Sequence, residues 1–252
     1  MGYHLAMPDH DFKAQRLYVA ADLAAGVRIA CTAGQAHYLR NVLRLGPGDP
    51  VLVFNGRQGE WRARLGEAIG RGVALEIAAL ARDQTAGPDI DYLFAPLKRA
   101  RLDYMVQKAV ELGVARLRPV LTQHTTAERV NLDRMRANVV EAAEQCGVLR
   151  VPEVLAPERL ARALESWEGA RRLIFCDERA AVADPLAALR AVPPGPLAVL
   201  IGPEGGFSDA ERSLLMSRNW CVPIALGPRI MRADTAAVAA LALVNATHGD
   251  WT

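Results

Sequence analysis

The feature that most constrains the fold is a regular alternation of strand-like and helix-like segments after residue 91. Short apolar runs that predict strands occupy residues 92–97, 117–121, 173–176, 197–201 and 222–226. Segments with helical spacing of apolar residues occupy residues 103–112, 132–146, 157–167, 208–218 and 235–247. Alternation of this kind is typical of a mostly parallel sheet covered by helices. The sequence therefore predicts an α/β fold for this part of the chain.

The first third of the chain has a different pattern, with several short strands at close spacing. We predict strands at residues 16–20, 27–31, 50–54, 61–65 and 73–80. A helix is predicted at residues 35–45, ended by Gly46 and Pro47, and Asn55-Gly56 is a good turn signal. This pattern indicates a small β-barrel. The polar stretch at 82–89 predicts the boundary between a domain of residues 1–84 and a domain of residues 85–252.

Composition excludes several classes of protein. The chain has 252 residues, of which 51% are hydrophobic and 23% charged, as in an ordinary globular protein. The four cysteines form no C-x-x-C pair, so we expect no structural metal, and free thiols suit a reducing cytoplasm. We expect no membrane span and no signal peptide. A net charge of +2 neither demands nor excludes a nucleic-acid partner.

One glycine-rich turn, at residues 200–208, follows an apolar strand and precedes a helix. Its sequence L-I-G-P-E-G-G-F-S lets a ligand approach the main chain, and Ser208 and Glu211 predict a capping box. Ligands of α/β proteins bind at this edge of the sheet. The spacing is neither G-x-G-x-x-G nor a P-loop. The residues alone leave open whether this is a ligand site or a structural turn.

A second glycine turn, at residues 226–236, leads into an alanine-rich helix. Asp234 or Thr235 is expected to cap that helix. Small side chains on the helix allow another segment of backbone to come close. A core helix and a ligand site are both compatible with this pattern.

Six motifs together resemble a known family. They are G-P-E-G-G-F-S at 202–208, L-G-P-R-I-x-R-x-x-T-A at 226–236, R-x-D-x-M-V-Q-K-A-V-E-L-G-V at 101–114, E-A-A-E-Q-C-G-x-x-R-V-P-E at 141–153, H-Y-L-R-N-V-L-R-L-G-P-G-D at 37–49 and F-N-G at 54–56. They resemble the ribosomal small-subunit RNA uridine-N3 methyltransferases, the RsmE family of the SPOUT superfamily. The resemblance covers nearly the whole chain after residue 16.

This resemblance implies a specific architecture and activity. A PUA-like RNA-binding β-barrel would precede a SPOUT domain with a trefoil knot, and the protein would act as a homodimer. It would methylate N3 of a uridine in 16S ribosomal RNA within the small ribosomal subunit. The resemblance assigns S-adenosylmethionine binding to Cys176, Glu178, Leu200, Ile201, Gly202, Glu204, Gly205, Gly206, Leu226, Gly227, Pro228, Ile230, Met231 and Thr235.

Three residues are candidates for catalysis, one as a cation and two as alternatives for the base. Methyl transfer to N3 requires an unpaired uridine and the loss of the N3 proton. Arg232 would stabilise the developing anion, and an arginine paired with a carboxylate is the alternative interpretation. Glu204 is a candidate base, and Asp234 is an alternative that the sequence does not separate from it.

A set of basic residues, most of them within the motifs, suits phosphate contacts, although each taken alone is more easily a solvated surface charge. The candidates for RNA binding are Arg16, His37, Arg40, Arg44, Lys98, Arg99, Arg101, Lys108 and Arg150.

The chain departs from the family where L-R-T-E-T-A is common, because Ala233 and Asp234 stand there instead, and where Val148 and Leu149 precede Arg150. Three other functions stay open. They are a non-catalytic RNA-binding protein of this fold, a SPOUT enzyme acting on transfer RNA or a ribose hydroxyl, and a nucleotide-binding α/β enzyme.

Overall fold

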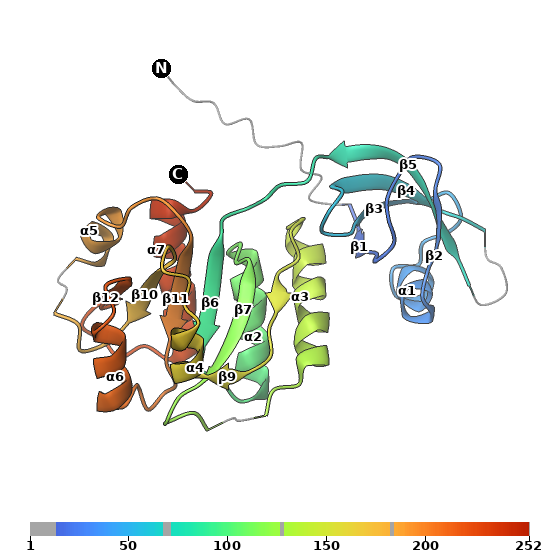
Figure 1. The fold of residues 1–252 in the computed structure, drawn as a ribbon. Coiled ribbons are helices and arrows are strands. Elements are labelled where there is room, and N and C mark those ends of the chain that lie inside the picture. Colours follow the sequence, from blue (N-terminus) through green and yellow to red (C-terminus); the bar gives the residue numbers. More distant parts are fainter. Residues whose placement is uncertain (1–13, 68–71, 127–128, 182–183, 252) are drawn as a thin grey trace, which may run out of the picture. The chain divides into compact units, whose positions relative to one another are not determined.

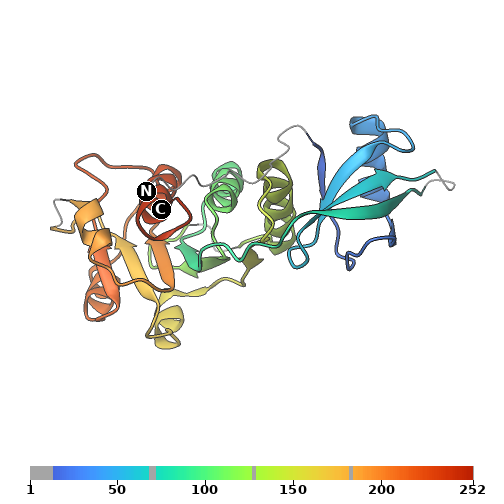
Figure 2. The same ribbon diagram turned by 90° about the horizontal axis from the view of Figure 1, so that it is seen from above.

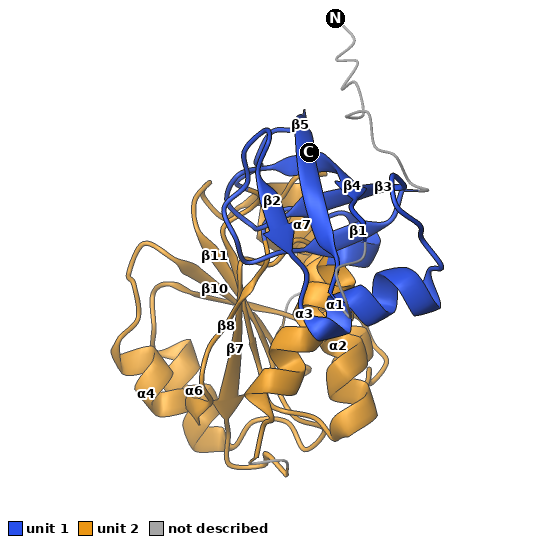
Figure 3. Ribbon diagram, turned by 90° about the vertical axis from the view of Figure 1, so that its right-hand side faces the viewer, with its two compact units in different colours: residues 1–86, 144–150 blue, residues 87–143, 151–252 orange. Residues whose placement is uncertain are grey.

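The computed structural model describes residues 14–67, 72–126, 129–181 and 184–251. The chain divides into two compact units, coloured separately in Figure 3. The first unit runs up to Ala86 and also takes Glu144–Arg150, and the second comprises Gly87–Ala143 and Val151–Thr252. Residues Glu144–Arg150 pack with the first unit, where Glu144 accepts a hydrogen bond from the Tyr18 backbone N–H, at 2.7 Å.

The first unit is built on one curled sheet. Its strands are β1 (Arg16–Tyr18), β2 (Arg28–Ala30), β3 (Pro50–Phe54), β4 (Glu60–Leu65) and β5 (Ala74–Arg82), close to their predicted bounds. Their order is β1-β3-β4-β5-β2, and only the β1–β3 pair is parallel. Alternate side chains such as Val51, Val53 and Leu75 fill its core. This curled, largely antiparallel sheet is the PUA-like part of the predicted fold.

The helix predicted at 35–45 lies at residues 33–42, and its two halves have different hydrogen-bond patterns. Helix α1 (Ala33–His37) begins with a capping box between Thr32 and Gln35, and continues as the π-helical turn η1 (Tyr38–Val42). The π-turn ends where the Leu43 N–H bonds to the Tyr38 carbonyl. Apolar periodicity predicts a helix but does not distinguish an α-turn from a π-turn.

The second unit is a parallel sheet between helices, as the alternation predicted. Its strands are β6 (Ile90–Phe94), β7 (Arg116–Leu121), β8 (Glu153–Val154), β9 (Glu158–Arg159), β10 (Arg172–Cys176), β11 (Leu197–Ile201) and β12 (Cys221–Ile224). The main path is β12-β10-β11-β6-β7-β8, with every pair parallel, and β9 pairs with β7 (Figure 1).

Helices cover both faces of this sheet. They are α2 (Arg99–Glu111), α3 (Leu132–Cys146), α4 (Leu160–Glu165), α5 (Pro185–Arg190), α6 (Asp209–Met216) and α7 (Ala233–His248). In Figure 2, α2, α3 and α7 lie on one face, and α4 and α6 lie on the other. The face under α4 and α6 has a core that includes Leu93, Phe175, Leu215 and Trp220. Apolar burial therefore fixes both layers against the sheet.

Local signals explain several helix ends, and four features differ from prediction, the first being that α2 begins at Arg99 and not at residue 103. Gly113 follows α2 at φ +72°, which a glycine adopts without strain. Helix α4 is shorter than predicted because β9 takes the preceding residues, and α5, capped by Asp184, was not predicted. The predicted caps of α7 are wrong. The helix begins at Ala233 with Arg232 as its cap residue, and Asp234 accepts a hydrogen bond from the Thr235 N–H inside the first turn.

The last strand and last helix lie in different parts of the second unit. Strand β12 is at the sheet edge, yet α7 packs against α2, α5 and β11 further in. In the described ranges, no helix is both long and apolar enough to cross a membrane.

Candidate cofactor site

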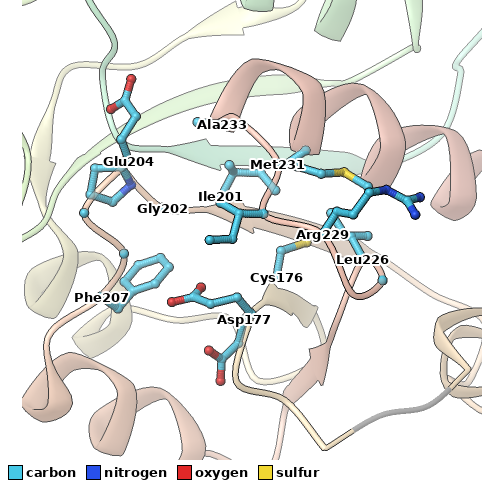
Figure 4. Close-up of a pocket in the computed structure, with 17 residues that line it drawn as sticks. Cys176, Asp177, Ile201, Gly202, Glu204, Phe207, Leu226, Arg229, Met231 and Ala233 are labelled. Atoms are coloured by element: carbon cyan, nitrogen blue, oxygen red, sulfur yellow. The ribbon is translucent and has the colours of Figure 1, made fainter.

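The two glycine bends meet at the carboxyl ends of three neighbouring strands. Because β12, β10 and β11 lie side by side, the segments that leave them surround one cavity of about 270 Å³ (Figure 4). The lining residues are Cys176, Asp177, Glu178, Ile201, Gly202, Pro203, Glu204, Gly205, Gly206, Phe207, Leu226, Gly227, Arg229, Ile230, Met231, Ala233 and Ala236. The sequence predicted this meeting of the two bends, and the geometry places them around one hollow.

The first bend, residues 202–206, is closely packed. A Cβ at Gly202 would lie 2.6 Å from the Phe207 ring, which makes an edge-to-face contact with Phe175 at 5.1 Å between centroids. Gly206 has φ +67°, and a Cβ there would meet the Glu178 carboxylate at 3.1 Å. These positions therefore require glycine for two reasons, close approach and backbone conformation.

A residue outside the motif holds the same bend. The Nδ1 atom of His124 lies 3.0 Å from the Gly205 carbonyl oxygen and 3.2 Å from that of Gly206. Carbonyl oxygens only accept, so His124 donates from Nδ1. The loop after β7 thereby fixes the direction of the bend that lines the cavity. Sequence reasoning missed His124 because it lies 81 residues from Gly205.

The predicted capping box is present and has a second use. The Ser208 hydroxyl accepts from the Glu211 N–H, and the Glu211 carboxylate accepts from the Ser208 N–H at 2.9 Å. The other carboxylate oxygen of Glu211 accepts from the Gln123 N–H at 2.8 Å. One side chain therefore starts α6 and anchors the loop that carries His124.

The end of β10 supplies the floor of the cavity. Asp177 is buried and accepts a hydrogen bond from Arg212 Nε at 2.7 Å, which neutralises its charge. Burial raises the pKa of the neighbouring Cys176 thiol to about 12. Cys176 therefore presents a neutral, soft surface to the cavity at neutral pH.

The second bend, residues 226–232, is open. Gly227 has φ +105°, a Cβ added to it would meet no atom within 4 Å, and Ile230 is 97% exposed. Ala233, which replaces the larger residue common in the family, is 7% exposed and lines the cavity. The bend contributes apolar surface without close support from the rest of the unit.

Charge is concentrated at the rim of the cavity. Glu204 pairs with Arg101 at the start of α2, with 3.1 Å between Oε1 and Nη1. Figure 4 shows the Glu204 carboxylate pointing away from Ile201 at the centre of the site. The pair is about half exposed, so either partner can exchange for a ligand at small cost.

Eleven of the fourteen residues predicted to bind the cofactor line the cavity. Leu200, Pro228 and Thr235 do not, and Leu200 is fully buried in β11. Asp177, Pro203, Arg229 and Ala233 also line the cavity and lie within the predicted cofactor-binding segments without being singled out, whereas Phe207 and Ala236 lie just outside those segments and were missed. Phe207 stands within the first motif, and its apolar character after two glycines was an available signal. Arg232 is exposed and does not line the cavity.

The candidate RNA-binding residues of the first unit fall into two groups. Arg16 is 7% exposed and pairs with Glu60 at 2.9 Å. Burial opposes ionisation of Glu60, but hydrogen bonds and charge from Arg82 and Arg16 hold its pKa below the ordinary value. This buried pair argues against a phosphate contact by Arg16. His37, Arg40 and Arg44 are all exposed at α1 and η1, as RNA contacts require.

The remaining candidates differ in their surroundings. Lys98 and Arg99 are exposed at the start of α2, beside Arg101. Lys108, on the same helix, pairs with Glu111 at 2.6 Å, and Arg150 donates to the Ala86 carbonyl at 2.7 Å. Only the start of α2 therefore gathers several predicted cations near the cavity.

Comparisons with known proteins agree with this geometry. Residues 85–245 match the model of an RNA methyltransferase domain, and residues 32–78 match an RNA methyltransferase PUA domain. Ribosomal RNA small subunit methyltransferase E of Synechocystis is 32% identical over 92% of this chain and 78% of that protein. The protein of that name from Rickettsia conorii is 26% identical over 92% of this chain and 96% of that protein.

A solved structure has the same fold throughout. Ribosomal RNA small subunit methyltransferase E of Neisseria gonorrhoeae, crystallised with S-adenosylmethionine, superposes with a TM-score of 0.82 at 29% identity. The match covers 95% of this chain and 100% of that one. The chain thus belongs to the RNA methyltransferase family of ribosomal RNA small subunit methyltransferases E, the RsmE family that its motifs resemble.

Proposed function

We propose that this protein uses S-adenosylmethionine to methylate N3 of one uridine in 16S ribosomal RNA within the small ribosomal subunit. The observation that carries the proposal is the cavity between the two glycine bends, in a chain of this family. Relatives named for small-subunit RNA methylation support the substrate, and the relative crystallised with S-adenosylmethionine supports the cofactor.

The cavity residues fit this cofactor. Ile201, Leu226 and Met231 offer apolar surface for the adenine ring, and the exposed backbone of Gly205 and Gly206 accepts close approach. When bound, S-adenosylmethionine supplies an electrophilic methyl group on a sulfonium. The protonated Cys176 thiol and the neutralised Asp177 add no competing nucleophile or bare charge to the floor.

The chain's own side chains would manage the proton of the base. N3 of uracil loses its proton as it attacks the methyl carbon and the sulfur–carbon bond breaks, so a base is required. Glu204 at the rim accepts that proton once Arg101 has turned to the RNA, and Arg232 moves in to stabilise the uracil anion. Asp234 is the alternative base, but its carboxylate already accepts a hydrogen bond from the Thr235 N–H.

Mass spectrometry of ribosomal RNA from cells that lack the gene tests the proposal. We expect the loss of one N3-methyluridine from 16S RNA, restored by the wild-type chain. Glu204→Gln and Arg232→Ala should bind S-adenosylmethionine normally and transfer tritium from it to small subunits far more slowly. Full activity of either variant removes the role proposed for that residue. If the cells instead lose a methyl group from transfer RNA, or from a ribose, that RNA or ribose is the substrate and the proposal is wrong.

We also propose that residues 1–84 bind RNA and residues 85–252 carry the methyl transfer, in a cytoplasmic homodimer. The exposed His37, Arg40 and Arg44 support the first assignment. The 97% exposed Ile230 beside the cavity supports a partner subunit that covers it. Sedimentation should give twice the chain mass for the wild type, and Ile230→Asp should shift it toward the monomer. A monomeric wild type removes the dimer.

A further inference from the structure

A second, larger hollow lies beside the cofactor cavity. It opens between the start of α2 and the segment that leads into α3, with a volume of about 1300 Å³. Glu204 lines both hollows, so the two are neighbours on either side of the Glu204–Arg101 pair. We call this second hollow the α2–α3 groove. A ligand that lies in it reaches the rim of the cofactor cavity.

The α2–α3 groove is strongly basic. Its lining contains five cations, Lys98, Arg99, Arg101, Arg129 and Arg134, and two carboxylates, Asp103 and Glu204. Both carboxylates are already used. Asp103 accepts two hydrogen bonds from Arg134, and Glu204 pairs with Arg101. The lining of the groove therefore carries a net positive charge.

Three of the cations have no acidic partner among the residues that the structure describes. In the part of the chain that the structure describes, no carboxylate pairs with Lys98, Arg99 or Arg129, and all three are exposed. Surface charges left uncompensated in a concave site focus the potential and attract an anionic ligand. Lys98 and Arg99 are among the predicted RNA contacts, although neither stands in a quoted motif, and Arg129, which comes from another segment, was not predicted.

The floor of the groove is apolar. Leu97, Val106 and Met135 line it and are buried. An apolar floor under a basic rim suits a polymer whose backbone is anionic and whose faces are apolar. Single-stranded nucleic acid has both properties, because its bases are unpaired and free to stack.

We infer that the α2–α3 groove binds the single-stranded RNA that flanks the target uridine. Lys98, Arg99 and Arg129 neutralise its phosphates, and its course delivers the uridine to the rim at Glu204. This inference rests on the proposed function for the identity of the strand. A duplex does not suit the site, since its bases are paired and its apolar faces are covered.

The test compares two triple variants of the full chain. Lys98→Ala/Arg99→Ala/Arg129→Ala removes the unpaired cations of the groove. Arg162→Ala/Arg190→Ala/Arg218→Ala removes the same charge from exposed sites outside it. Fluorescence anisotropy measures the binding of a short labelled oligouridylate over a series of KCl concentrations, with a blunt RNA duplex as a second probe. Calorimetry measures the binding of S-adenosylmethionine to each variant.

The groove variant should bind the oligouridylate at least tenfold more weakly than the wild type. Its slope of log affinity against log salt should fall by about 2, at roughly 0.7 per cation lost. The control variant should lose less than half as much, and both should bind S-adenosylmethionine normally. Equal losses in the two variants, or an equal loss with the duplex probe, overturn the inference. Failure of the wild type to methylate small subunits would count against the proposed function alone, since oligouridylate binding is measured separately.

Discussion

The two glycine bends that enclose the cofactor cavity differ in how they are held. The bend at 202–206 has the Phe207 ring under it, and the His124 imidazole donates to two of its carbonyls. The bend at 226–232 has Gly227 in open space and Ile230 97% exposed. Both follow parallel strands and both line the same cavity, so the difference comes from the neighbouring segments.

This difference separates two tasks. A bend that its neighbours hold in one conformation offers a cofactor pre-arranged backbone groups and costs little to order on binding. A bend without such support can adapt to what covers it, at the cost of ordering it. We therefore expect the first bend to supply affinity and orientation and the second to supply a cover. Four changes test this contrast, from the largest expected effect to the smallest.

Removing the apolar support of the first bend should have the largest effect. Phe207→Ala deletes a ring that is 8% exposed and packs on Phe175, so the free energy of unfolding should fall by about 3–5 kcal/mol. Arg229→Ala, a truncation of an exposed side chain in the second bend, should alter it by less than about 0.5 kcal/mol. Urea titration of both variants measures this. Comparable losses in the two would abolish the contrast.

Adding a methyl group to the first bend should have the next largest effect. In Gly202→Ala the new Cβ would lie 2.6 Å from the Phe207 ring, which is itself confined by Phe175. Overpacking of this kind costs about 1–3 kcal/mol, and we expect it mainly as weaker S-adenosylmethionine binding in calorimetry. Gly169→Ala, which meets nothing within 4 Å, is the control and should bind normally. Normal S-adenosylmethionine binding by Gly202→Ala would show that the first bend can shift to make room for the methyl group and is not rigidly held.

Removing the imidazole that holds the first bend should have a smaller effect. His124→Ala loses one N–H that two carbonyls share, worth about 1 kcal/mol in all, so the Kd for S-adenosylmethionine should rise by roughly fivefold to tenfold. His124→Asn places an amide N–H at the same distance along the side chain and should restore much of the affinity. An asparagine variant as weak as the alanine variant would assign His124 a packing role instead.

These contacts also mark what the sequence can predict. The capping box of Ser208 and Glu211 spans three residues, and the strand before it is a continuous apolar run, so both follow from local pattern. Meeting of the two bends at one edge follows from parallel topology. The support of the first bend comes from a loop 81 residues away in sequence, and no periodicity reports such a pairing.

The predicted RNA contacts show the same limit. The sequence identifies Arg16 as a cation within a resembling segment, but not that Glu60, 44 residues away, would bury and neutralise it. Conversely, Arg129 stands in no quoted motif, yet it lines the groove beside Lys98 and Arg99. The sequence shows which residues are charged, but contacts between distant segments decide whether a charged side chain is accessible to a ligand.

The smallest effect is expected in a protection experiment on the Cys176 thiol, which lines the cavity with both bends. Cys176 lines the cavity, and Cys221 does not, but burial raises the pKa of each thiol to about 12. Because the thiolate is the nucleophile, alkylation of both should keep accelerating as pH rises from 9 toward 12. Bound S-adenosylmethionine should slow alkylation of Cys176 alone, followed by peptide mass spectrometry. Equal slowing at both thiols would mean that the cofactor tightens the whole unit, and the second bend would then be no more than a passive wall.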